Sequence, residues 1–212
     1  MQPLSIMLRI DVWSDVVCPW CYIGDARFDK ALAQFDGEVE IVRHPFQLDP
    51  EAPIPGVPAR ERYASRFGDE AQAMLDRVTT EAASEGIRFD FDRALTANTF
   101  DAHRALRFAS ERGKEHELEH ALFAAYFSDG LDISDRNVLA ERGASVGLNA
   151  EELLRYLESD AGVDEIRREL LHAMEIGISG VPSFLFNREF LVPGAVDAPT
   201  FLRILEQLSN VA

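Results

Sequence analysis

The two cysteines of this chain lie three residues apart, in the segment Cys18-Pro19-Trp20-Cys21, where a strand-like pattern gives way to a helical one. Apolar residues alternate over positions 8–13, which predicts a strand, and they recur at helical spacing over positions 22–35. Side chains at i and i+3 share one face of a helix, so the two thiols can close a disulfide with modest local adjustment. The segment therefore predicts a dithiol where a strand leads into a helix.

The start of a helix is a favourable place for a reactive thiol. Its unpaired N–H groups and the positive end of its dipole both favour a thiolate, and Pro19 costs no hydrogen bond in the first turn. Cys18, at the helix start, is therefore expected to be the nucleophile, with the less exposed Cys21 as its resolving partner. Trp20 brings no positive charge to the loop.

A zinc site is the alternative interpretation of a C-x-x-C pair. Zinc needs four ligands in a structural site, and the chain has no second C-x-x-C. His116 and His120 have ligand-like spacing, but they are interleaved with Glu115, Glu117 and Glu119, a pattern typical of a solvated helix face. We therefore expect a redox pair and no metal site.

Composition limits the partners and the compartment. The chain has 212 residues, enough for one large domain or a domain with an inserted subdomain, and its net charge of −16 argues against nucleic acid and anionic membranes. No stretch is long enough to span a bilayer, and Met1–Met7 lacks the features of a signal peptide. A cytoplasmic location is expected, where a single close cysteine pair is typically transient and catalytic.

The predicted elements follow the order β-α-β, then helices, then β-β-α. The β-branched run at positions 39–46 predicts a second strand, parallel to the first because a helix connects them. Prolines interrupt the pattern between positions 45 and 58, and positions 60–174 are almost wholly helical. Two short β runs between positions 183 and 192 predict a hairpin, which a closing helix follows.

A C-x-x-C pair within a β-α-β unit is typical of thioredoxin-like redox proteins. The predicted fold is therefore α/β: a thioredoxin-like core interrupted by an all-helical insertion. Residues 1–50 and 175–212 would form the discontinuous core. Residues 51–174 would form the insertion, including the last helix that returns to the core.

Within the insertion, helices and their ends can be placed from local signals. One helix is predicted from a stripe of six apolar side chains: Phe67, Ala71, Met74, Leu75, Val78 and Ala82. Helix caps are expected at Asn98 or Thr99, at Ser134 and at Asn149. Gly177 is expected to end the last long helix.

A second motif, Gly177-Ile178-Ser179-Gly180-Val181-Pro182-Ser183-Phe184, stands between that helix and the hairpin. Alone it predicts only a turn, since few X–Pro bonds are cis. At this place in the element order it matches the cis-proline loop that faces the C-x-x-C pair in thioredoxin-like proteins.

The chain resembles the DsbA superfamily, in particular its cytoplasmic FrnE-like branch, which groups with the dithiol-disulfide isomerases of polyketide biosynthesis clusters. Several separate stretches carry the resemblance: positions 14–24 around the cysteines, 98–104, 125–127 with 132–135, and 180–182. The superfamily fold is a thioredoxin domain with a helical insertion.

The resemblance implies roles for individual residues. Cys18 would attack a substrate disulfide and Cys21 would resolve the mixed intermediate. Pro182, in the cis form, would shape the surface beside the sulfurs, and the backbone of Val181 would pair with an extended substrate segment.

Other residues are weaker candidates for the substrate cleft. Pro19 and Trp20 belong to the substrate-facing surface in this interpretation, and Trp13 is either part of its apolar rim or plain core. Asn98 and His103 are either the insertion's contribution to the cleft or, respectively, a helix cap and a surface or core side chain. The best-known periplasmic members carry a histidine between the cysteines where this chain has Trp20, so strongly oxidising character is not expected to transfer.

The leading hypothesis is a cytoplasmic thiol–disulfide oxidoreductase or isomerase with a redox-active centre, acting on disulfides of proteins or small molecules. No bound cofactor is expected, and glutathione is a candidate co-substrate. The alternative enzyme is a glutathione-dependent transferase or isomerase of the kappa-class or 2-hydroxychromene-2-carboxylate isomerase type, which needs no resolving cysteine. A third hypothesis is a non-enzymatic adaptor that binds a partner in the cleft and merely retains the cysteines. The related folds occur as monomers and homodimers.

Overall fold

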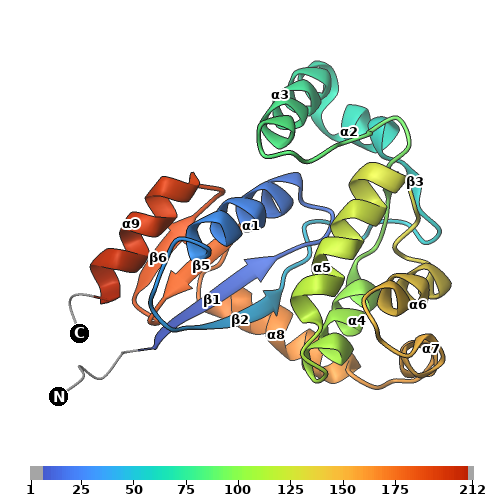
Figure 1. Ribbon diagram of the computed structural model, residues 1–212. Helices are drawn as coiled ribbons and strands as arrows, with labels where there is room; N and C mark the ends of the chain where they lie inside the picture. The colour runs from blue at the N-terminus through green and yellow to red at the C-terminus, as the bar shows by residue number, and fades with distance from the viewer. Residues whose placement is uncertain (1–6, 210–212) are drawn as a thin grey trace.

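A four-stranded sheet in the order β2-β1-β5-β6 organises the chain, whose computed structural model describes residues 7–209 (Figure 1). The strands are β1 (Leu8–Ser14), β2 (Val39–Pro45), β5 (Ser183–Phe186) and β6 (Phe190–Pro193). β1 and β2 run parallel because helix α1 (Pro19–Leu32) connects them, whereas the β1–β5 and β5–β6 pairs are antiparallel. β1 therefore lies inside the sheet, and only three residues separate its end from Cys18.

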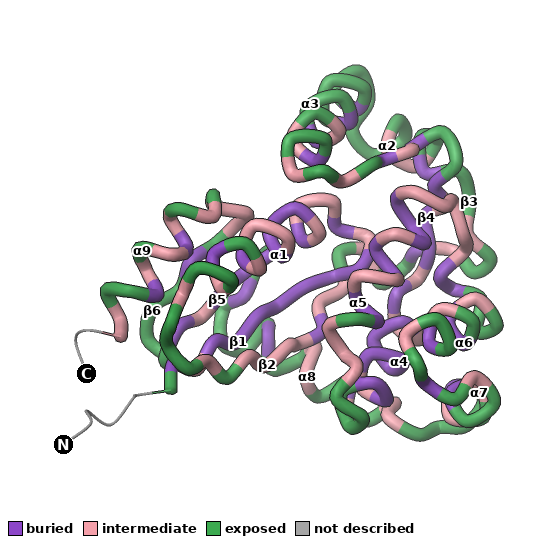
Figure 2. The backbone as a smooth tube through the Cα atoms, viewed as in Figure 1, coloured by how far each residue is buried: buried purple, intermediate pink, exposed green. Residues whose placement is uncertain are grey.

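Helices cover both faces of this sheet. On one face, α1 and α9 (Ala198–Ser209) pack through aromatic contacts, with the Phe28 ring 5.2 Å from Phe184 and 5.1 Å from Phe201 between centroids. On the other face, Trp13 packs with Ala173 of α8 (Val163–Glu175). Because β1 is covered on both sides, its polar and apolar positions alike are largely buried, as Figure 2 shows.

The segment between β2 and α8 is mainly helical. Its elements are β3 (Val57–Pro58), α2 (Ala59–Phe67), the 3-10 turn η1 (Gly68–Glu70), α3 (Ala71–Ser84), β4 (Leu95–Thr96), α4 (Phe100–Ser110), α5 (Glu115–Ala124), the π-helical turn η2 (Ala125–Asp129), α6 (Arg136–Ser145) and α7 (Ala150–Glu158). One apolar cluster joins these helices to Cys18 and Cys21. The cysteine pair therefore lies where the sheet meets the helical segment.

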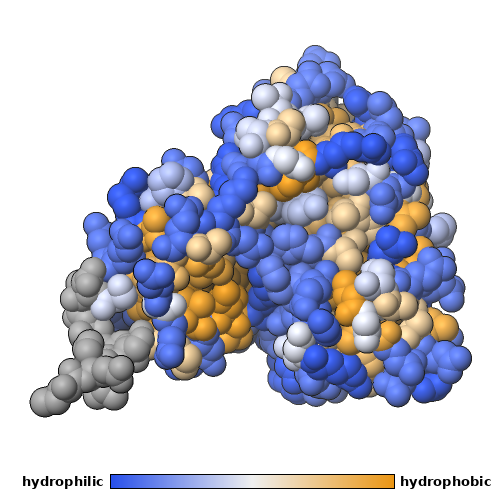
Figure 3. Space-filling view, viewed as in Figure 1, coloured by the Kyte–Doolittle hydropathy of each residue, from blue (hydrophilic) through white to orange (hydrophobic). Residues whose placement is uncertain are grey.

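The predicted fold class is confirmed: a thioredoxin-like α/β fold carries an additional helical segment. The boundaries at positions 50 and 175 stay a prediction. In the space-filling view, hydrophilic residues cover most of the visible face and hydrophobic ones gather in a few patches (Figure 3). The prevalence of hydrophilic residues agrees with the large excess of acidic side chains in the sequence.

Two local predictions in the helical segment are wrong. The single apolar stripe is divided between α2 and α3, because Gly68 at the end of α2 takes a φ of 57° that stops the helix; Phe67 and Met74 are 37% and 42% exposed. Ser134 does not cap α6: the side chain of Asp135 accepts from the backbone of Asn137 instead.

Two other helix ends are as predicted. Asn149 caps α7, its Oδ1 accepting from Glu152 N at 3.1 Å. Gly177, with a φ of 83°, follows the end of α8.

Candidate active site

The cysteine pair occupies the first turn of α1. Cys18 is the N-cap residue, with an extended backbone (φ −87°, ψ 113°), and Pro19 opens the helix without losing a hydrogen bond. The backbone N–H of Cys18 donates to Asp15 O at 2.8 Å, which fixes the turn that leads out of β1. Both cysteines are free and approach to 3.2 Å, so only a short movement separates the dithiol from a disulfide.

Both thiols are covered by the surrounding chain. Cys21 was expected to be the less exposed thiol. In the structure Cys18 is 3% exposed and Cys21 is 1% exposed, so the two thiols differ little in exposure. Burial raises the pKa of the Cys21 thiol well above its ordinary value, and the neighbouring Cys18 raises it further. Cys21 therefore keeps its proton until a reaction step removes it, which suits a resolving thiol.

The loop before β5 faces the nucleophile. Cys18 Sγ lies 3.6 Å from Val181 O, and the Val181–Pro182 peptide is cis, as predicted from the second motif. Hydrogen bonds hold the loop: Ser183 Oγ donates to Gly180 O at 2.8 Å, and Gly194 N donates to Pro182 O at 2.8 Å. The loop thus presents backbone groups and the Pro182 ring beside the sulfur of Cys18.

Gly24 allows α1 to come this close to the loop, a role that the sequence analysis did not identify. A Cβ at position 24 would lie 3.1 Å from Pro182 Cγ and 3.2 Å from Ala195 Cβ, which is tighter than nine in ten real Cβ contacts, so these neighbours would have to shift by a few tenths of an ångström. No local pattern distinguishes such a glycine from an ordinary helical one, because the conflict arises only when the helix meets a loop more than 150 residues away.

The two tryptophans have different surroundings. Trp13 is buried and stacks on His44 with ring centroids 4.7 Å apart, so it belongs to the core and not to a rim. Trp20 is half-buried, and the guanidinium carbon of Arg77 on α3 lies 5.8 Å from its ring centre. The motif itself carries no cation, but the tertiary structure supplies one.

Asn98 and His103 both contact the backbone of the segment that follows β2, and Asn98 also contacts the start of α4. Asn98 Oδ1 accepts from Phe100 N at 3.0 Å, as a residue at a helix start does, while its Nδ2 donates to Pro50 O at 2.8 Å. His103 is buried, and its Nε2 donates to Phe46 O at 2.9 Å. Asn98 thus serves the start of α4, and His103 belongs to the core beneath the cysteine turn.

Asp15 is a buried residue of the site that we did not single out from the sequence. Its Oδ2 accepts from Leu48 N at 2.8 Å, and Oδ1 has no hydrogen-bond partner among the described residues, although His103 Nε2 lies 3.4 Å away. Its place in the stretch before the cysteines that carries the family resemblance was the available signal, but burial can be read only from the fold.

A pocket of about 150 Å³ opens next to the cysteine turn. Val17 and Tyr63 are among its lining residues, with Arg62 and Arg66 contributed by α2. Burial raises the pKa of the Tyr63 hydroxyl, and the nearby Cys18 adds to the effect, so this group stays protonated at neutral pH. The pocket thus places a tyrosine and two arginines close to Val17, the residue before Cys18, and the Arg62 guanidinium pairs there with Asp49.

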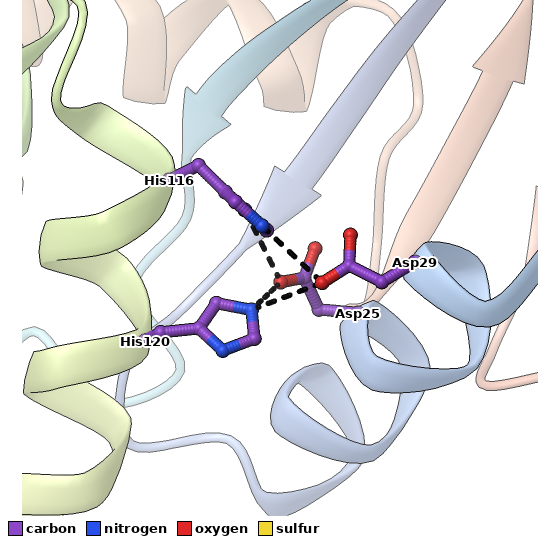
Figure 4. A group of neighbouring side chains, drawn as sticks. All are labelled: Asp25, Asp29, His116 and His120. Atoms are coloured by element: carbon purple, nitrogen blue, oxygen red, sulfur yellow. Dashed lines mark hydrogen bonds and ion pairs between the residues drawn. The ribbon is translucent and has the colours of Figure 1, made fainter. Parts of the chain in front are cut away.

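The two histidines of α5 are not on a solvated helix face, so that prediction is wrong. α5 packs beside α1, where His120 Nε2 donates to Asp25 Oδ2 at 2.6 Å (Figure 4). Between the histidines, Glu119 is buried and pairs with Arg43 of β2. The charge-rich spacing of α5 reflects contacts with α1 and β2 that local sequence cannot reveal.

The fold and the dithiol at the start of α1, facing a cis-proline loop, define a thioredoxin-like protein with a helical insertion. The DSBA-like thioredoxin domain family matches residues 9–206, and the chain belongs to this family of thiol oxidoreductases.

Similar proteins agree with this assignment. The crystal structure of the probable DsbA oxidoreductase SCO1869 from Streptomyces coelicolor is 36% identical, with a TM-score of 0.89 over 97% of this chain and 91% of that one. The uncharacterized protein YwbO of Bacillus subtilis is 30% identical over 92% of this chain and 94% of its own length. The 2-hydroxychromene-2-carboxylate isomerase of Sphingobium xenophagum is 23% identical, over 82% of this chain and 86% of its own.

Over residues 7–209, no helix has the length and apolar character needed to cross a membrane.

Proposed function

We propose that this protein is a cytoplasmic thiol–disulfide oxidoreductase that acts on disulfides of proteins or small molecules, with Cys18 as nucleophile and Cys21 as resolving thiol. The observation that carries the proposal is the pair of free cysteines, 3.2 Å apart in the first turn of α1 and beneath the Val181 carbonyl. Membership of the DSBA-like family and similarity to a probable DsbA oxidoreductase support it.

The reaction begins when the Cys18 thiolate attacks one sulfur of a substrate disulfide. A bond forms between Cys18 Sγ and that sulfur, the substrate S–S bond breaks, and the departing thiolate takes a proton from water. The unpaired N–H groups and the positive dipole end of α1 favour the thiolate form of the attacking group.

Resolution then requires the buried Cys21 to lose its proton. Its thiolate attacks Cys18 Sγ, an intramolecular disulfide forms, and the second substrate sulfur leaves as a thiol. The substrate has gained two electrons and two protons, and the protein pair has become oxidised. Two molecules of an external thiol such as glutathione would return the pair to the dithiol and leave as their own disulfide. The reverse sequence would oxidise a substrate dithiol, and displacement of Cys18 by another thiol of the same substrate would isomerise its disulfides.

Residues of the facing loop would position the substrate. The backbone of Val181 would pair with an extended substrate segment, as strands pair at a sheet edge. Pro182, Pro19 and the ring of Trp20 would provide the apolar surface on either side of the reacting sulfurs.

A redox titration tests this function. The protein is equilibrated in graded buffers of reduced and oxidised glutathione, and free thiols are trapped with an alkylating reagent and counted by mass spectrometry. A reversible two-electron transition between dithiol and intramolecular disulfide is expected, and its midpoint indicates reductant or oxidant. Failure to form that disulfide would refute the proposal.

The second candidate function is a glutathione-dependent transferase or isomerase. It is favoured by the similarity to the 2-hydroxychromene-2-carboxylate isomerase along most of both chains, and by the pocket next to Cys18 with its tyrosine and arginines. In that case the titration yields only a mixed disulfide with glutathione, and Cys21→Ser leaves turnover largely intact.

A further inference from the structure

A cluster of metal-ligating side chains joins α1 to α5, away from any role in the proposed reaction. It consists of Asp25, Asp29, His116 and His120, and we refer to it as the α1–α5 cluster. Each helix contributes two residues spaced by one turn, so both members of a pair point to the same side. Figure 4 shows the two imidazoles and the two carboxylates converging on one point between the helices.

The spacing of the four groups is close to that of a tetrahedral site. Zinc binds nitrogen and oxygen at about 2.0–2.2 Å, which separates tetrahedral ligands by about 3.3–3.6 Å. Asp29 Oδ2 lies 3.2 Å from His116 Nε2 and 3.4 Å from His120 Nε2. All four ligand atoms lie within 4.8 Å of one another.

One of these distances must change on binding. His120 Nε2 and Asp25 Oδ2 lie 2.6 Å apart because a hydrogen bond joins them. An ion that replaces this hydrogen would move the two atoms further apart, by about 0.7–1.0 Å, to reach tetrahedral spacing.

A second layer of contacts orients the ligands. Arg43 donates to Asp25 Oδ1 at 2.8 Å, which leaves Oδ2 directed at the histidines. Such outer hydrogen bonds are usual around protein metal sites. Arg43 also donates to His116 Nδ1 at 2.7 Å, which requires the proton of this imidazole to be on Nε2. Binding an ion through Nε2 moves that proton to Nδ1, so the contact between Arg43 and His116 must be lost. The side chain of His116 is 44% exposed, which leaves room for this adjustment.

The charge of the surroundings suits a dication. Asp25 and Glu119 pair with the guanidinium of Arg43, and Asp29 adds a third carboxylate, so these four groups carry a net charge of −2. Burial lowers the pKa of His120, but Asp25 and Asp29 raise it to about 10, so an ion that binds must displace a proton from this imidazole. Asp25 is buried, whereas Asp29 and the histidines are partly exposed, so an ion can enter from one side.

We propose that the α1–α5 cluster binds one Zn²⁺ ion, which fastens the helix that carries the cysteines to a helix of the insertion. Two imidazole nitrogens and two carboxylate oxygens are a ligand set that zinc accepts in tetrahedral geometry. With four protein ligands, the site is a closed, structural one. The proposal departs from the expectation, drawn from the sequence, that the chain has no metal site.

The test uses the full chain with Cys18→Ser and Cys21→Ser, so that no thiolate can bind metal. Zn²⁺ is titrated in competition with a chromophoric indicator, and one equivalent is expected to bind. Introducing His120→Gln or Asp29→Asn should weaken binding at least about 100-fold, since loss of a ligand costs more than loss of an outer hydrogen bond. The matched control is His172→Gln, an exposed histidine on α8 whose nearest carboxylate is 3.8 Å away, and it should leave affinity unchanged.

Circular dichroism verifies that each variant is folded, and Co²⁺ reports geometry independently of affinity. A tetrahedral site gives Co²⁺ intense visible absorption, and His120→Gln should abolish it. The proposal is overturned if the thiol-free protein binds no equivalent of Zn²⁺. It is equally overturned if both cluster variants bind as tightly as their parent, or if Co²⁺ shows only the weak absorption of octahedral coordination.

Discussion

Gly24→Ala tests whether the approach of α1 to the cis-proline loop is as close as the structure has it. In a helix interior, alanine is more favourable than glycine by about 0.8–1 kcal/mol. The new Cβ would lie 3.1 Å from Pro182 Cγ and 3.2 Å from Ala195 Cβ, and overpacking of this kind costs about 1–3 kcal/mol. We therefore expect the variant to be less stable by between about 0 and 2 kcal/mol, in place of the gain that an open helical site would give.

The measurement is urea unfolding of the reduced protein, with the rate of exchange with a disulfide peptide followed in parallel. The new Cβ would displace the cis-proline loop, whose Val181 carbonyl lies 3.6 Å from Cys18 Sγ. The rate of exchange with the disulfide peptide should therefore fall together with the stability.

Ala195→Gly, which removes one of the two close contacts, serves as the second arm of a double-mutant cycle. Because the two sites are coupled, the double variant should be more stable, by at least about 0.5 kcal/mol in the free energy of unfolding, than the sum of the two single effects predicts. A variant with Gly24→Ala alone that gains about 1 kcal/mol and exchanges at the normal rate would refute the close contact.

Three further predictions follow from single residues. Cys21→Ser should accumulate a mixed disulfide with substrate at Cys18, detected by intact-mass analysis, because no thiol remains to resolve it. Arg104→Met should lower the free energy of unfolding by about 3–5 kcal/mol, since this buried guanidinium donates to four backbone carbonyls between positions 156 and 161. Burial lowers the pKa of His44, but the hydrogen bonds that its imidazole donates to the carboxylates of Glu169 and Asp11 outweigh this effect and raise the pKa above 6.5. The stability that His44 contributes should be full below pH 6.5 and be lost as pH rises through the higher folded value.

Each of these has a control or a contrary result. Cys18→Ser should form no mixed disulfide under the conditions used for Cys21→Ser. Arg107→Met, at a partly exposed arginine of the same helix, should change stability by less than about 1 kcal/mol, and equal losses at both positions would contradict the role given to the buried hydrogen bonds. His44→Asn should reduce the difference in unfolding free energy between pH 6 and pH 8, and an unchanged difference would show that another group titrates.

Local sequence was sufficient for the elements that carry the dithiol. Some features act only on their neighbours in the chain, so their effects can be predicted without knowing the fold. They are the alternating residues of β1, the proline in the first turn of α1 and the glycine after α8. The same holds for the hairpin of β5 and β6 and for the loop containing Pro182, whose place in the element order identified it.

Contacts between distant residues were decided only by the tertiary structure. His120 and Asp25 are 95 positions apart, so the helical spacing of α5 could not distinguish a solvated face from one that packs on α1. Three other features arise in the same way, when separate elements meet: the need for glycine at position 24, the burial of Asp15 and the cation beside Trp20. Backbone propensity and hydrophobic periodicity depend on residues close together in the chain, so the sequence alone determines them. Burial and charge pairing depend instead on which surfaces the folded chain brings together.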